Sequence, residues 1–413
     1  MDLRIDVAYY DDVEENLLQK NYPNEFERID QIVKAGYIKV PFADFKTYSQ
    51  MHHRNSEYGK LNSFTTIQEN IGDLYGNVNV YTGFEIETGR FYTEYPNNNE
   101  QNHVSESIGC GGALSVLSQI YGLTQADWQR INIQGHKDFD FDSAVIENFN
   151  KMIVVEAKGS IVSDNSLKSN FSYHKSNIKE KKSDEGFKSK YAKGTDLLIG
   201  GITVIDKVNH AKIYLVDPPE VSQLDEKFRL KIKILKRLTF YLDWISIISK
   251  RAYFTIALKN RVKALEKIDD ISKLNFLALV NASNKQLQVS DDFVKSRSNI
   301  GGTIIGNLSE IKSKKAVFIG LNMELYNLIM EQDFKGISSY KADSFIGNRR
   351  IDIKISGKKA ESSEFIRNID VDYRKGRSEL FHFIVEDAIV FQNSAGVIYS
   401  IITTKNKYSL PYE

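Results

Sequence analysis

Cysteine, proline and long apolar runs are scarce in this chain of 413 residues. Its single cysteine, Cys110, cannot form a disulfide within the chain or build a zinc site that needs several cysteines. We therefore expect a reducing, cytoplasmic setting. The most apolar stretch, residues 238–258, is interrupted by Asp243, Lys250 and Arg251, so no contact with a membrane is expected. Six prolines beside 22 tyrosines and 23 phenylalanines argue against long disordered linkers.

The chain also lacks a strong charge of either sign and a G-x-x-x-x-G-K-[ST] phosphate-binding loop. A formal net charge of +1 means that any nucleic-acid-binding surface must be a local patch. Without the loop, the chain contains no recognisable ATP-driven motor, and any such step would need a partner. Its length exceeds what one hydrophobic core usually supports, so two or three domains are expected.

Two neighbouring stretches carry charged residues at the spacing of a strand face. Residues 138–142 read Asp-Phe-Asp-Phe-Asp, and residues 152–159 read Met-Ile-Val-Val-Glu-Ala-Lys-Gly. Because successive side chains of a strand point to opposite faces, Glu156 and Lys158 share a face, and so do the three aspartates. Desolvating such charges is costly, whereas binding a hard divalent cation such as Mg²⁺, which takes oxygen ligands, would justify the cost.

Hydrophobic periodicity places these stretches in a longer series of elements. It predicts a helix from Ser105 to Tyr121, ended by Gly122. The elements that follow are strands at 130–134, 138–146 and 152–160, a helix within 167–193, and strands at 197–205 and 211–216.

This pattern resembles the PD-(D/E)XK nuclease superfamily, whose core places an Asp on one strand and (Asp/Glu)-x-Lys on the next. Lys137 stands where the signature has its proline. The element order α-β-β-β-α-β-β agrees with the core topology of the superfamily. The resemblance covers about residues 101–220, and it implies an α/β fold with a central restriction-endonuclease-like αβββαββ core and a mixed sheet.

Composition divides the chain into three predicted parts. Residues 1–100 are expected to form an N-terminal α+β domain, with a helix at 25–35 and a hairpin at 81–95. Residues 101–220 would form the nuclease-like domain, and residues 221–413 a C-terminal α+β domain for substrate or partner binding. A polar loop and a proline pair mark the two boundaries.

The resemblance implies a metal-dependent site. Glu156 would bind Mg²⁺, with Mn²⁺ as an alternative, and Lys158 would act at the attacking water or the phosphate. Antiparallel pairing through a tight turn would set Asp140 roughly opposite Lys158 and Asp142 roughly opposite Glu156. Asp140 is therefore the first choice as catalytic metal ligand, followed by Asp142 and then Asp138, and the choice among them stays open.

Glu106 is the fourth predicted member of this catalytic and metal-binding set. It lies early in the predicted helix, where superfamily members often carry an acidic residue that faces the metal. Gly109, Gly111 and Gly112 would let this helix pack close to the sheet. The alternative is that Glu106 only favours the helix N-terminus through the macrodipole.

Two basic stretches are predicted to contact the phosphates of a nucleic acid. Lysine clusters contact phosphates without reading the base sequence, and their affinity falls steeply with salt. A solvated helix face is the alternative for both stretches. The residues expected to bind are Lys168, Lys175, Lys179, Lys181, Lys182, Arg229, Lys233 and Arg237.

Two further groups are weaker candidates. His136 and His174 lie near the predicted site in sequence and could touch a substrate, although such histidines are more often surface residues. Asp352 and Lys354 also read Asp-x-Lys in a strand, but they lack the surrounding series of elements, and the neighbouring arginine pair indicates a basic surface.

Together these features predict a Mg²⁺-dependent nuclease. DNA is the expected substrate because most superfamily members act on it, although RNA is not excluded. A role in bacterial restriction or antiphage defence is expected by analogy with other nucleases of this kind. One alternative is a sequence-specific homodimeric restriction endonuclease. Another is a catalytically silent nucleic-acid-binding or assembly subunit on a nuclease scaffold. A chain with one active site would need a second copy to cut both strands of a duplex, so a homo-oligomer is expected. A regulatory protein is the other expected partner.

Overall fold

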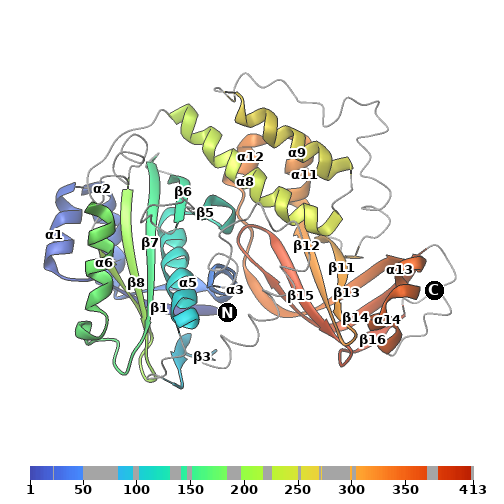
Figure 1. The fold of residues 1–413 in the computed structure, drawn as a ribbon, viewed down its shortest axis with the longest axis horizontal. Helices are drawn as coiled ribbons and strands as arrows, with labels where there is room; N and C mark the ends of the chain where they lie inside the picture. The colour runs from blue at the N-terminus through green and yellow to red at the C-terminus, as the bar shows by residue number, and fades with distance from the viewer. Residues whose placement is uncertain are drawn as a thin grey trace. The chain divides into compact units, whose positions relative to one another are not determined.

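The structure is a computed structural model with two compact units (Figure 1). It describes residues 1–21, 23–49, 82–95, 102–130, 141–146, 151–183, 197–216, 226–249, 253–268, 271, 298–299, 304–369 and 380–410. Described residues up to 236 form the first unit, and those from 237 onward form the second. In this described part of the chain, no helix combines the length and the apolarity needed to cross a membrane.

A seven-stranded mixed sheet organises the first unit, in the order β2-β1-β9-β8-β7-β6-β5. Its strands are β1 (Asp2–Tyr9), β2 (Tyr37–Pro41), β5 (Trp128–Arg130), β6 (Phe141–Ile146), β7 (Lys151–Ile161), β8 (Leu197–Ile205) and β9 (Ala211–Val216). β1 runs parallel to β9 and β7 runs parallel to β8, while the other neighbours are antiparallel. The mixed α/β class predicted from the sequence is confirmed.

Two helices cover opposite faces of this sheet, α5 (Asn102–Tyr121) and α6 (Ser172–Ser183) (Figure 1). Among the described residues from 105 to 216, the helices and strands follow the predicted order, although the first strand is found at Trp128–Arg130 instead of 130–134. The first helix ends before Gly122, which has a φ of +65°. The predicted strand residues 131–134 and 138–140 lie outside the described residues.

Close backbone approach fixes α5 on β7. A Cβ built at Gly159 of β7 would overlap the carbonyl oxygen of Ser105, and one at Gly109 would overlap the backbone of Lys158. On the other face, a Cβ at Gly200 of β8 would meet the side chain of Ile178 in α6. The glycines therefore set how closely both helices pack on the two central strands.

The described residues of the expected N-terminal domain, 1–100, belong to the same compact unit as the predicted nuclease-like domain. Ile5 of β1 pairs with Ala211 of β9, so the sheet of the predicted nuclease domain continues into the first residues of the chain. Leu3, Ile5 and Val7 are buried in the same hydrophobic core as Ile108 of α5. A boundary drawn from local composition missed this pairing because the two strands lie far apart in sequence.

The local elements predicted in this region are nevertheless confirmed. The helix expected at 25–35 is α2 (Pro23–Ala35), and the hairpin is formed by β3 (Thr82–Glu85) and β4 (Arg90–Thr93). Gly36 follows α2 with a φ of +81°, and Gly89 precedes β4 with a φ of +69°. Glycine is favoured at both positions because a residue with a side chain rarely adopts these angles. The remaining elements are α1 (Asp12–Asn21), α3 (Phe42–Thr47) and the 3₁₀ turns η4 (Gln125–Asp127) and η5 (Lys168–Asn170).

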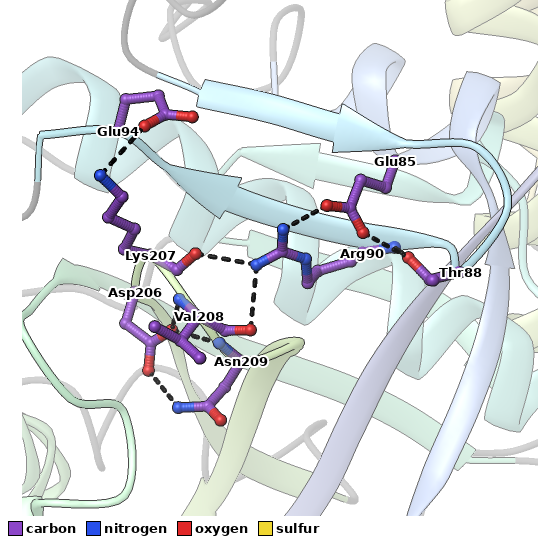
Figure 2. Close-up of polar contacts among 8 residues, drawn as sticks. All are labelled: Glu85, Thr88, Arg90, Glu94, Asp206, Lys207, Val208 and Asn209. Atoms are coloured by element: carbon purple, nitrogen blue, oxygen red, sulfur yellow. Dashed lines mark hydrogen bonds and ion pairs between the residues drawn. The ribbon is translucent and has the colours of Figure 1, made fainter.

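The hairpin is bound to the turn between β8 and β9 (Figure 2). Arg90 pairs with Glu85 and donates to the carbonyl oxygens of Lys207 and Val208 at 2.8 and 2.9 Å. Within the turn, the buried Asp206 carboxylate accepts from the backbone N–H groups of Val208 and Asn209 (Figure 2).

The same carboxylate also anchors the connection that leads to α6. Asp206 accepts a hydrogen bond from the backbone N–H of Asn165 at 2.9 Å, and Asn165 donates to the carbonyl oxygen of His210 at 2.7 Å. The segment between β7 and α6 is therefore fixed on the edge of the β8–β9 turn, which helps to place α6 over the sheet.

The second unit is built on a seven-stranded antiparallel sheet in the order β13-β10-β11-β12-β15-β14-β16. β13 also pairs with β14, so the sheet closes on itself around a core that includes Ile351, Ile353 and Phe383. Its strands are β10 (Ser298–Asn299), β11 (Ile304–Lys312), β12 (Lys315–Asn322), β13 (Phe345–Ser356), β14 (Leu380–Gln392), β15 (Val397–Thr403) and β16 (Tyr408–Ser409).

Helices precede the strands of this sheet in the sequence or lie between them. They are α8 (Glu226–Ser249), α9 (Tyr253–Glu266), α11 (Met323–Glu331), α12 (Phe334–Ser339), α13 (Gly357–Ser362) and α14 (Glu364–Asn368). α8 and α9 lie in the part of the chain that was expected to form the C-terminal α+β domain. The division between the two units falls within α8, after residue 236, rather than at the predicted proline pair.

Candidate functional site around Glu156

Glu156 lies at the middle of β7, between β6 and β8, and its side chain is fully buried. It pairs with Gly200 of β8, and Lys158 pairs with Ile202. Because Gly200 faces Ile178 of α6, Glu156 and Lys158 also lie on the α6 face of the sheet. The predicted sharing of one face by Glu156 and Lys158 is therefore confirmed.

Two lysines converge on one oxygen of this carboxylate. Lys158 forms an ion pair with Oε1 of Glu156, and Nζ of Lys181 from α6 lies 2.6 Å from the same oxygen. The lysine side chains are 22% and 21% exposed, whereas the glutamate is 0% exposed. One buried carboxylate thus meets two ammonium groups from partly exposed side chains, which offset the cost of burying its charge.

The predicted register of the acidic strand is wrong by two residues. Asp142 pairs with Val154, not with Glu156. The register shifts between Ser143 and Ile146, so counting outward from a regular tight turn aligns the strands incorrectly. The side chain of Asp142, together with Asp138, Asp140 and His136, lies outside the residues that the structure describes.

Glu106 lies on α5, which covers the face of the sheet opposite to α6. It is exposed on α5, and α5 packs on the face of β7 from which Gly159 points. Glu156 and Lys158 lie on the other face, against α6. The prediction that Glu106 faces the metal site followed from its place in the helix, which did not indicate which face of the sheet the helix covers.

The described residues supply one carboxylate toward a metal ion. Glu156 fits the preference of Mg²⁺ for carboxylate oxygen, and Mg²⁺ usually takes only one or two protein carboxylates. Within the described ranges, no group of three or more His, Cys, Asp or Glu residues could hold a metal ion. Glu156 is thus the one predicted ligand whose side chain the described residues place on this face, and its expected companion, Asp140, falls outside these ranges.

Two lysines predicted to bind nucleic acid are instead paired within the protein. Lys175 forms ion pairs with Asp11 and with Glu14, the latter at 2.8 Å, and Lys179 lies 2.8 Å from the same oxygen of Glu14. Glu14 of α1 is 1% exposed. These contacts bind α6 to α1, so a phosphate contact by Lys175 or Lys179 would have to compete with an ion pair inside the protein.

The other residues predicted to contact phosphates differ in how exposed they are. Lys168 is exposed, and its ammonium lies 5.5 Å from the ring of Tyr10 and 5.7 Å from that of Tyr214. Lys233 is buried. The side chains of Lys182 and Arg229 lie outside the described residues. Among these four, Lys168 is the residue that the structure places at the surface.

Arg237 is a structural residue rather than a phosphate ligand. Its side chain is 1% exposed. Nη1 donates to the carbonyl oxygens of Ile337 and Tyr340 at 2.7 and 2.8 Å. These carbonyls lie at the C-terminal end of α12, where a cation is favoured by the helix dipole. The basic composition of its stretch could not distinguish this buried cap from an exposed phosphate contact.

His174 and Ser160 form a further polar contact on the same face of β7. Nε2 of His174 lies 2.9 Å from Oγ of Ser160 and 3.2 Å from the carbonyl oxygen of Gly159. Both side chains are buried, so His174 is not the surface residue that its type suggested. Ser160 was missed at the sequence level, although its spacing of two from Lys158 predicts that it shares the face of Lys158.

The second Asp-x-Lys pair lies on β13 of the other unit. Asp352 pairs with Ile384 and Lys354 with His382 of β14. Arg350 lies 3.7 Å from Asp352. Asp352 is only partly buried, unlike Glu156, so the environment of this pair differs from that of Glu156 and Lys158.

Comparison of the chain with protein-family models, with curated proteins and with solved structures finds no match. Any functional conclusion therefore depends on the residues and geometry of the chain itself.

Proposed function

We propose that the first unit is a metal-dependent nuclease of the PD-(D/E)XK type that hydrolyses phosphodiester bonds of DNA. The observation that carries this proposal is the fully buried carboxylate of Glu156 on a central strand, with Lys158 on the same face. Glu14 is also a buried carboxylate with two lysine partners, but it lies on a helix, whereas Glu156 lies on a central strand with Lys158 two residues further on.

The connectivity around Glu156 supports the proposal. β5, β6 and β7 form an antiparallel meander, and α6 then connects β7 to the parallel strand β8. The helices before and after the meander, α5 and α6, cover opposite faces. This arrangement agrees with the core topology that the resemblance implies, and Glu-x-Lys falls on its third strand.

The residues would divide the chemistry as follows. A divalent cation bound here supplies Lewis-acid activation of water and neutralises charge that develops on the phosphate. Glu156 would hold the cation, and Asp140 is the expected second ligand. Lys158 would orient the attacking water or stabilise the phosphate charge, and Lys181, which contacts the same oxygen of Glu156, would add a second positive charge there.

One alternative function also has an observation in its favour. The described residues contain no complete group of metal ligands, and both lysines already engage Glu156. A catalytically silent nucleic-acid-binding subunit on the same scaffold would fit this arrangement. Restriction or antiphage defence, cytoplasmic location and homo-oligomerisation stay proposals by analogy and from composition.

The test is cleavage of supercoiled plasmid, linear duplex, single-stranded DNA and RNA with Mg²⁺ or Mn²⁺. The wild type is compared with Glu156→Gln and Lys158→Ala. Glu14→Gln is the matched control, since Glu14 is also a buried glutamate with two lysine partners. Metal-dependent cutting of DNA that both site variants lose and the control keeps supports the nuclease. Equal cutting by Glu156→Gln would exclude this site, and metal-independent binding without cutting would favour the silent scaffold.

A further inference from the structure

The backbone directly after Lys158 is held from both faces of the sheet. On one face, α5 approaches so closely that Gly159 has no room for a side chain beside Ser105. On the other face, Nε2 of His174 contacts the carbonyl oxygen of Gly159 at 3.2 Å and Oγ of Ser160 at 2.9 Å. Residues 159–160 therefore lie between a helix backbone and a buried imidazole.

The contact with Gly159 defines the tautomer of the imidazole. A carbonyl oxygen can only accept a hydrogen bond, so Nε2 must carry the proton that it donates. Oγ of Ser160 lies within reach of the same N–H group. Nδ1 then carries a lone pair, and it has no hydrogen-bond partner among the described residues.

The surroundings keep this imidazole neutral. Burial, followed by the nearby Lys158 ammonium, lowers the pKa of His174 to about 4. A second proton would have to be placed on Nδ1, which is buried and has no acceptor in the described part of the chain. His174 thus donates to β7 as a neutral group over the pH range in which most proteins act.

We infer that His174 is a positioning residue for Lys158. Its hydrogen bonds fix Gly159 and Ser160 on the α6 face, and the fixed backbone directs the Lys158 ammonium toward Oε1 of Glu156. Its role in catalysis rests on the proposed nuclease function. Its effect on Lys158 is a property of the fold that can be measured without any cleavage.

The direct test is competitive acylation of lysines in the full chain, read by mass spectrometry. His174→Leu removes the donor, whereas His174→Gln places an amide N–H near the position of Nε2. In His174→Leu, labelling of Lys158 should rise about fivefold, the size expected when a partly exposed ion pair loosens. In His174→Gln, it should stay within about twofold of wild type.

Lys179 is the internal control, because it lies on α6, is 44% exposed and pairs with Glu14 rather than Glu156. An increase confined to Lys158 supports positioning. Equal increases at Lys158 and Lys179 would mean that α6 has loosened as a whole, and unchanged labelling at Lys158 would mean that His174 does not hold it. Either result overturns the inference.

His174→Asn serves if His174→Leu does not fold, since its shorter amide stays polar but stops short of Gly159. Cleavage is then measured separately. If the nuclease proposal holds, His174→Leu should lower kcat about tenfold with KM for duplex DNA unchanged, and His174→Gln should restore it. The two proposals can therefore fail separately. If labelling rises only at Lys158 in His174→Leu but the wild type cleaves no substrate, His174 still positions Lys158, and the nuclease proposal alone is contradicted.

Discussion

Two buried glutamates in the first unit have almost the same chemical surroundings but different places in the fold. Glu14 and Glu156 are 1% and 0% exposed, and each accepts ion pairs from two lysines. The lysines of Glu14 both come from α6, one turn apart, and join two helices. Those of Glu156 come from β7 and α6. The comparison teaches that a buried Glu-Lys cluster does not by itself mark a reactive site. The proposal for Glu156 therefore depends on its place on a central strand of the sheet.

The largest expected difference between the clusters is in cleavage. Glu156→Gln should lower the rate of metal-dependent DNA cleavage about a thousandfold or more, because it removes the carboxylate proposed to hold the cation. Glu14→Gln should leave the rate within about threefold of wild type. Plasmid relaxation at matched concentrations of folded protein measures both. Similar losses in the two variants would erase the distinction between the clusters.

The next largest effect is the loss of stability at acid pH that we expect from His174 of α6. The folded pKa of His174, about 4, lies below its ordinary value of 6.5, so the unfolded chain binds more protons between these values. The stabilisation is present above pH 6.5 and is lost as the pH falls toward 4, by up to about 3 kcal/mol.

Urea unfolding of wild type and His174→Gln at a series of pH values isolates this contribution. The difference between the two proteins should change through that window and become constant above it. A difference that is constant from pH 4 to pH 7 would show that His174 is protonated as easily in the folded protein as in the unfolded chain.

A smaller effect is expected on the free energy of unfolding when the Glu14 cluster is changed. Glu14→Gln leaves Lys175 and Lys179 without their shared carboxylate, so the free energy of unfolding should fall by about 2 kcal/mol. The double variant Glu14→Gln with Lys179→Gln should recover part of the loss, because it also removes one uncompensated charge. Denaturant unfolding at pH 7 checks both, and no loss in the single variant would contradict a structural role for Glu14.

The smallest effect concerns the lysines around α6. Lys168→Ala should weaken DNA binding a few-fold and reduce the salt slope by about 1, since Lys168 is exposed. Lys179→Ala should leave both nearly unchanged, since its ammonium pairs with Glu14. Salt-dependent fluorescence anisotropy measures the two slopes. A larger effect for Lys179 would indicate that its ion pair opens on binding.

Local patterns predicted the elements well. The strands at 197–205 and 211–216 and the helix ended by Gly122 were found because periodicity and helix caps are short-range signals. The shared face of Glu156 and Lys158 follows from strand parity alone. These features depend only on neighbours in the chain.

Long-range geometry was not predictable in the same way. The pairing of β1 with β9, the irregular register at Asp142 and the face covered by α5 all depend on contacts between distant residues. Charge patterns likewise indicated that Lys175 and Arg237 are cations but not that Glu14 and the end of α12 bind them. Residue type defines what a side chain can do, and the fold decides its partner.

The pairing of β1 with β9 also has a consequence for synthesis on the ribosome. Ile5 is made about 200 residues before its partner, Ala211. At translation rates of about 5–20 residues per second, the nascent chain would carry the apolar face of β1 without its partner for about 10–40 seconds. We therefore expect the sheet to close only after β9 has emerged, and chains stopped before residue 211 to bind chaperones.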